Sequence, residues 1–90
     1  MNTPPEPDLF QFPCEFPIKI IGADLAALQT LVEAVLREHA PDSLAAPRPT
    51  RPSRNGRYLS MTFTVRAVSR EQLDSIYRAL TASEHVVWAL

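Results

Sequence analysis

The sequence predicts an α+β domain in which two helices cover one face of a four-stranded antiparallel sheet. Residues 59–67 alternate between apolar and polar side chains, which is the period of a strand with one buried face. Residues 24–39 and 69–83 carry apolar side chains at spacings of three and four, which is the period of a helix with one buried face. Ninety residues allow one small domain, so these three segments are expected to share a single core.

The chain begins with a segment whose prolines disfavour a helix or a central strand. Residues 1–11 combine several prolines with two acidic residues, a composition that predicts a disordered tail. The folded domain is expected over residues 12–90. Its first strand is predicted at residues 16–21, where Phe16, Ile18 and Ile20 alternate with the residues between them.

The first helix follows this strand directly. Gly22 ends the strand, and Asp24 is placed to cap the helix because its carboxylate can accept a free backbone N–H of the first turn. On the polar side, Glu33 and Arg37 are expected to form an ion pair one turn apart. The predicted buried stripe consists of Leu25, Leu28, Leu31, Val32, Val35 and Leu36.

The middle of the chain is rich in proline and arginine. Residues 42–52 are expected to form a loop that leads into an irregular edge strand, about residues 48–53, because a central strand does not tolerate several prolines. The Asn55-Gly56 pair predicts a type I′ turn, in which both residues have positive φ. This turn would join the edge strand to residues 59–67.

The second helix and a last strand complete the pattern. Ser69 and Gln72 form a capping box at the start of the second helix. Residues 86–90 predict a short strand with Val86, Trp88 and Leu90 on one face and Val87 and Ala89 on the other.

The predicted order is strand, helix, strand, strand, helix, strand, which with right-handed crossovers is the ferredoxin-like βαββαβ sandwich. Sensor domains for small molecules, RNA-recognition domains and acylphosphatases all use this topology, so the fold alone does not select a function. The uncovered sheet face is expected to suit a homodimer or another protein partner. It would carry Lys19, Ile21, Ser60, Thr62, Thr64, Arg66, Val87 and Ala89.

Positive charge is concentrated in one part of the chain. The formal net charge is −1, yet no acidic residue lies between Asp42 and Glu71, so that span carries a charge of +6 and the remainder −7. The six cations are Arg48, Arg51, Arg54, Arg57, Arg66 and Arg70. The first four recur every third residue, which is the repeat of a polyproline II helix, and the neighbouring prolines favour that helix.

A row of guanidinium groups on one side of such a segment predicts a site for a small anionic metabolite or an acidic protein partner. A solvated loop without a ligand and a nucleic-acid interface are the alternatives. The negative overall charge and the absence of aromatic rings on the polar side of residues 59–67 weigh against nucleic acid.

The groups that could carry catalysis or hold a metal are few. Cys14, His39 and His85 are the only thiol and imidazole residues, and they are not spaced as a metal site. A hydrolase of the acylphosphatase type would need an arginine in the loop after the first strand, where the chain has Gly22, Ala23 and Asp24. We therefore expect a non-enzymatic protein without a cofactor or metal. No segment predicts a membrane helix or a signal peptide, so a cytoplasmic location is expected.

Several short segments together resemble the YbeD-like family of small uncharacterised bacterial proteins. They are Phe12-Pro13-Cys14, Phe16, Ile18-Lys19, Gly22, His39-Ala40-Pro41 and residues 53–60. The resemblance covers about residues 10–90 and implies a ferredoxin-like fold close to that of ACT regulatory domains. It also implies a bacterial cytoplasmic protein with a role near lipoate metabolism and no known catalytic residues.

The same resemblance implies a ligand near Gly22, in addition to the site predicted at Arg48, Arg51, Arg54 and Arg57. Free backbone N–H groups at a helix start favour an anion there, and a purely structural turn is the alternative. The chain departs from the family pattern at Asn55, where lysine is common. Its loop at residues 43–52 is also richer in proline and arginine than the family pattern.

Overall fold

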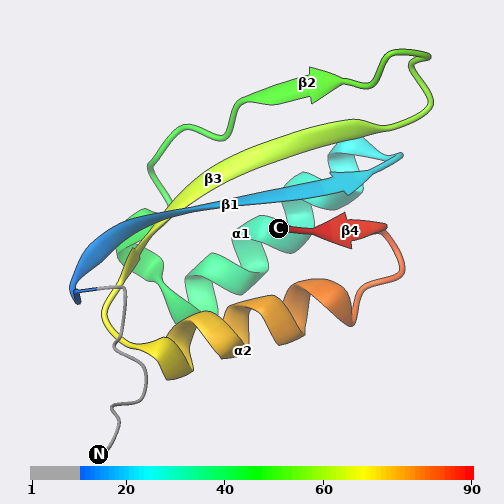
Figure 1. The fold of residues 1–90 in the computed structure, drawn as a ribbon. Coiled ribbons are helices and arrows are strands. Elements are labelled where there is room, and N and C mark those ends of the chain that lie inside the picture. The colour runs from blue at the N-terminus through cyan, green and yellow to red at the C-terminus, as the bar shows by residue number, and fades with distance from the viewer. Residues whose placement is uncertain (1–10) are drawn as a thin grey trace, which may run out of the picture.

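The computed structural model describes residues 11–90 and confirms the predicted ferredoxin-like α+β fold (Figure 1). The sheet is antiparallel with strand order β2-β3-β1-β4, and both helices lie on the same side of it. The elements are β1 (Cys14–Gly22), α1 (Leu25–His39), the 3₁₀ turn η1 (Pro41–Ser43), β2 (Thr50–Pro52), β3 (Leu59–Ala67), α2 (Arg70–Thr81) and β4 (Trp88–Ala89). The tail predicted over residues 1–11 lies, apart from Gln11, outside the described residues.

The core forms between the central strand pair and the two helices. β1 and β3 pair along their whole lengths, from Cys14 opposite Ala67 to Gly22 opposite Leu59. Their inward side chains meet the apolar stripes of both helices, as the two sequence periods predict. The predicted stripe is wrong at Leu25, which lies in the first turn of α1 and is 40% exposed. The fully buried side chains include Ile18, Ile20, Leu28, Val32, Leu36, Met61, Phe63, Val65, Ile76 and Leu80.

Two prolines lie within strands without breaking the sheet. The N–H of Lys19 points toward β4 and donates to the backbone oxygen of Leu90. Backbone nitrogens two residues apart in a strand point the same way, so the nitrogen of Pro17 also points to this side of β1, at a position beyond the end of β4. In β2, Ser53 donates its N–H inward to Tyr58, so the nitrogen of Pro52 faces the outer edge. Neither proline removes a hydrogen bond from a strand pair, and both remove a donor from an edge of the sheet.

The hairpin between β2 and β3 differs from the predicted type I′ turn. Among residues 11–90, Gly56 alone has a positive φ, of 75°, and Asn55 does not. Ser53 accepts from the N–H of Gly56 at 3.0 Å and donates to the carbonyl of Tyr58 at 2.8 Å, which closes a longer loop. The side chain of Asn55 accepts from the N–H of Arg57 at 3.0 Å, and this local bond favours the longer loop.

Both predicted N-cap residues are confirmed, whereas the return bond of the predicted capping box is made to Val68, one residue before the N-cap. The carboxylate of Asp24 accepts a backbone N–H of the first turn of α1 at 3.1 Å, and the hydroxyl of Ser69 accepts the N–H of Gln72 at 3.1 Å. The side chain of Gln72 reaches back to the N–H of Val68 at 2.7 Å and donates to the carbonyl of His39 at 2.8 Å. Gln72 therefore joins the beginning of α2 to the last residue of α1.

The last strand has the opposite orientation to the one predicted. Ala89 lies opposite Ile20 and packs against the core, whereas Trp88 lies opposite Ile21 on the uncovered side and is 59% exposed. Leu90 exchanges two backbone hydrogen bonds with Lys19, which fixes the register. A shift of one residue in register moves every side chain to the other face, and the alternation alone does not determine that register.

Candidate functional site

The sheet surface that neither helix covers is the open face. Residues directly opposite one another on paired strands point to the same side, so the register identifies its members. They are Glu15, Pro17, Lys19 and Ile21 on β1, Ser60, Thr62, Thr64 and Arg66 on β3, Arg51 on β2, and Trp88 and Leu90 at β4. Of the two residues expected here from the sequence, Ala89 faces the core instead, and Trp88 and Leu90 lie on the open face. Val87 precedes β4 and is 62% exposed.

One row of the open face crosses all four strands and changes character along its length. From β4 to β2 it consists of Trp88, Ile21, Ser60 and Arg51. Three strand spacings of about 4.8 Å separate its ends, which gives a length of roughly 14 Å. Lys19 occupies the adjacent row, opposite Thr62. The row is thus apolar at β4, has a hydroxyl in the middle and is cationic at β2.

Lys19 and Arg51 come together around two shallow hollows. Lys19, Arg51 and Ser60 line each hollow. The lining of the first hollow is mainly apolar and also includes Ile21, Pro52, Ser53, Tyr58 and Leu59, and that of the second also includes Pro49, Thr50 and Thr62. Within residues 11–90, no carboxylate lies within 4.0 Å of either cation. Two like charges without an acidic partner make this part of the open face attractive to an anion.

The third cation of the open face has a partner. Arg66 lies opposite Glu15, and their charged groups are 4.0 Å apart with both side chains more than half exposed. Such an exposed pair contributes little to stability. It does offset the charge of Arg66, so the excess positive charge is concentrated at Lys19 and Arg51.

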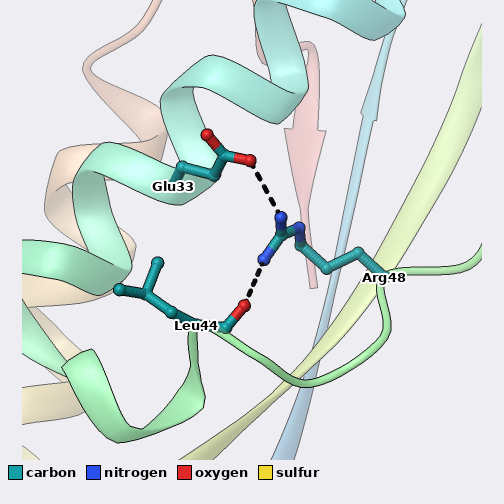
Figure 2. Close-up of polar contacts among 3 residues, drawn as sticks. All are labelled: Glu33, Leu44 and Arg48. Carbon is teal, nitrogen blue, oxygen red and sulfur yellow. Dashed lines mark hydrogen bonds and ion pairs between the residues drawn. The ribbon is translucent and has the colours of Figure 1, made fainter.

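The predicted row of four arginines is wrong at Arg48. Figure 2 shows its guanidinium between α1 and the following loop: it donates to the carboxylate of Glu33 and to the carbonyl of Leu44, each at 3.0 Å. Only 18% of this side chain is exposed. Glu33 therefore binds Arg48 in place of the predicted partner Arg37, because the loop after α1 passes back over that helix.

The other three arginines occupy two places. Arg51 lies on the open face, whereas Arg54 and Arg57 lie in the exposed hairpin loop between β2 and β3. The structure instead brings Arg51 close to Lys19. The sequence analysis placed Lys19 on the uncovered sheet face but did not include it in the predicted ligand site. The sequence feature that could have indicated Lys19 was the expected pairing of residues 16–21 with residues 59–67, because this pairing sets Lys19 beside the β3 hydroxyls.

Gly22 has a packing role in this structure. A Cβ atom at this position would overlap the carbonyl oxygen of His85 and press on the side chain of Leu28. The segment before β4 thus passes directly over the end of β1. This close approach explains why the position is a glycine. A structural role was the alternative to a ligand site in the sequence analysis.

The thiol and imidazole residues lie apart from the open-face cations. Cys14 is half-buried against the core, His39 ends α1 and His85 is exposed before β4. In the described part of the chain, no three histidine, cysteine, aspartate or glutamate side chains gather closely enough to hold a metal ion. None of the helices described is sufficiently long and apolar to cross a membrane.

The sequence as a whole matches a family described as a protein of unknown function, DUF493, over residues 7–90. The chain belongs to the DUF493 family. A similar UPF0250 protein of Bordetella pertussis (strain Tohama I) is 52% identical over 80 residues, which are 88% of this chain and 87% of that protein. A UPF0250 protein of Neisseria gonorrhoeae is 46% identical over 78 residues, 87% of this chain and 86% of that one.

These DUF493 and UPF0250 matches confirm the resemblance to the uncharacterised YbeD-like bacterial proteins. The solution structure of protein HP0495 from H. pylori is similar in fold, with a TM-score of 0.68. The match covers 100% of this chain and 94% of that one at 16% sequence identity. At this identity the likeness supports the fold alone.

Proposed function

We propose that this DUF493 protein is a non-enzymatic binding domain whose open face holds an anionic ligand at Lys19 and Arg51. The observation that carries the proposal is that these cations line the same hollows on both sides of Ser60 and have no acidic partner within residues 11–90. The ligand class is a carboxylate or a phosphate. A guanidinium offers paired donors to either group, and an ammonium adds a point charge beside it.

The surroundings of the two cations favour binding over catalysis. The hydroxyls of Ser60 and Thr62 can add hydrogen bonds to a bound anion. Among the described residues that line this hollow with them, there is no imidazole or carboxylate to activate either hydroxyl. The resemblance to ACT-type regulatory domains implies ligand binding without chemistry, which agrees with this composition. Regulation in response to a bound metabolite, near lipoate metabolism or elsewhere, is the role that the resemblance adds to the proposal.

The proposal is tested by titrating the ¹⁵N-labelled protein with inorganic phosphate at low ionic strength. We expect the backbone amide signals of Lys19, Arg51, Ser60 and Thr62 to shift in a saturable way. Because the attraction is electrostatic and exposed, the apparent affinity should fall as sodium chloride is added. The double variant Lys19→Gln, Arg51→Gln should lose these shifts.

A matched control removes two cations from the helices. Arg37 in α1 and Arg78 in α2 are both exposed, so the double variant Arg37→Gln, Arg78→Gln changes the net charge by the same amount. It should retain the phosphate shifts on the open face. Equal loss of binding in both double variants, or shifts confined to the helices, would contradict the proposal.

A further inference from the structure

We infer that the open face binds a short acidic segment of another protein, which places a carboxylate at Arg51 and Lys19 and an apolar side chain against Trp88 and Ile21. This inference rests on the proposed function, since it uses the same two cations. It goes further by naming the class of partner and by including Trp88, which a small anion at the cations would not reach.

The row from Trp88 to Arg51 sets the geometry of the partner. Trp88 is 59% exposed and Leu90 53% exposed, although both are large apolar residues on a sheet face. Exposed apolar groups that adjoin polar groups commonly mark protein interaction sites. An extended chain rises about 3.3 Å per residue, so a roughly 14 Å row fits an apolar and an acidic residue about four positions apart.

The edges of the sheet offer a poorer route for the same partner. An added strand would need N–H donors along an edge, and Pro17 and Pro52 each turn a nitrogen without hydrogen toward an edge. A partner would therefore be held by side chains across the open face rather than by backbone pairing.

A second copy of the chain fits the open face less well. In a two-fold symmetric dimer the same surface meets itself, so Lys19 and Arg51 would face a surface with the same charge excess. Like charges set against each other oppose association. An acidic segment supplies the opposite charge.

A nucleic acid also fits less well. Its backbone carries one phosphate per nucleotide, whereas the open face has two cations without acidic partners in the described residues. Trp88 supplies one ring for base stacking, and the whole chain has a net charge of −1. Two cations match the one or two carboxylates of a short acidic segment.

The inference is tested by selecting binders from a random twelve-residue peptide library displayed on phage, with the intact protein as the target. We expect the selected peptides to combine an aspartate or glutamate with a large apolar residue about three to five positions away. A synthetic copy of a selected peptide should bind Trp88→Ala and Arg51→Gln at least about tenfold more weakly than the wild type.

Two variants serve as matched controls for the selected peptide. Val68→Ala removes an apolar side chain that is 60% exposed and lies after β3, outside the open face. Arg78→Gln removes an exposed arginine on α2. Both should bind the peptide with the affinity of the wild type.

Several outcomes would overturn the inference. They are a failure to select peptides, selected peptides without acidic residues, and peptide binding that Trp88→Ala leaves unchanged. A native mass spectrum that shows a dimer lost in Trp88→Ala would assign the open face to a second copy. Binding of a twelve-nucleotide oligothymidine that requires Trp88 would assign it to nucleic acid. Phosphate shifts at Lys19 and Arg51 would still support the proposed function in each case.

Discussion

At the scale of single residues, Gly22 is required by packing rather than by backbone conformation. Its φ is not positive, yet a Cβ would overlap the carbonyl oxygen of His85. We expect Gly22→Ala to lower the free energy of unfolding by about 2 kcal/mol, because the segment before β4 must move away from β1. Urea unfolding measures the loss, and amide hydrogen exchange should show weaker protection in β4.

Gly56 provides the contrasting control. It has a φ of 75°, and nothing lies within 4 Å of an added Cβ. Gly56→Ala should cost about 1 kcal/mol of backbone strain, with changes confined to the hairpin loop. If Gly22→Ala also left the exchange of β4 unchanged, the packing explanation would be wrong.

At the scale of elements, Arg48 anchors the proline-rich loop between η1 and β2. It joins Glu33 of α1 to the carbonyl of Leu44, and β2 begins two residues later (Figure 2). We expect Arg48→Met to lower the free energy of unfolding by about 1 kcal/mol, a modest loss because Glu33 can be solvated. The amide of Arg51 should exchange faster, since its strand has lost this anchor.

Glu33→Gln changes the same contact less severely than Arg48→Met does. Its amide oxygen can still accept from the guanidinium, so it should lose less stability than Arg48→Met. Equal stability of Arg48→Met and the wild type, with unchanged exchange at Arg51, would show that the loop is held by other contacts.

The elements also show which parts of the fold the sequence predicts. Two helices and the long strand at residues 59–67 were predicted because their periods record local burial. The orientation of Trp88, the destination of Arg48 and the hairpin loop at Asn55 were not. Each depends on partners distant in sequence or on a choice between local hydrogen bonds. The spacing of apolar residues along the chain contains no information on either. Of the two cations in the proposed site, Arg51 was among the residues predicted from the sequence to bind a ligand. Lys19 was not, because only the pairing of strands distant in sequence brings it close to Arg51.

At the scale of the whole molecule, the open face and the remainder of the chain differ in charge. The side chains of the open face comprise three cations, Lys19, Arg51 and Arg66, and one acidic residue, Glu15, while the chain as a whole has a net charge of −1. This distribution predicts that the stability of the fold responds to anions. A ligand that binds only the folded state stabilises it by mass action.

Inorganic phosphate should therefore raise the melting temperature above that in sodium chloride of equal ionic strength. At a phosphate concentration about three times its Kd, linkage gives roughly 0.8 kcal/mol, or about 3–6 °C for a domain of this size. Differential scanning fluorimetry measures the difference. Phosphate also stabilises proteins through exclusion from their surfaces, so the decisive comparison is with Lys19→Gln, Arg51→Gln. A phosphate effect as large in this variant as in the wild type would mean that the two cations hold no anion.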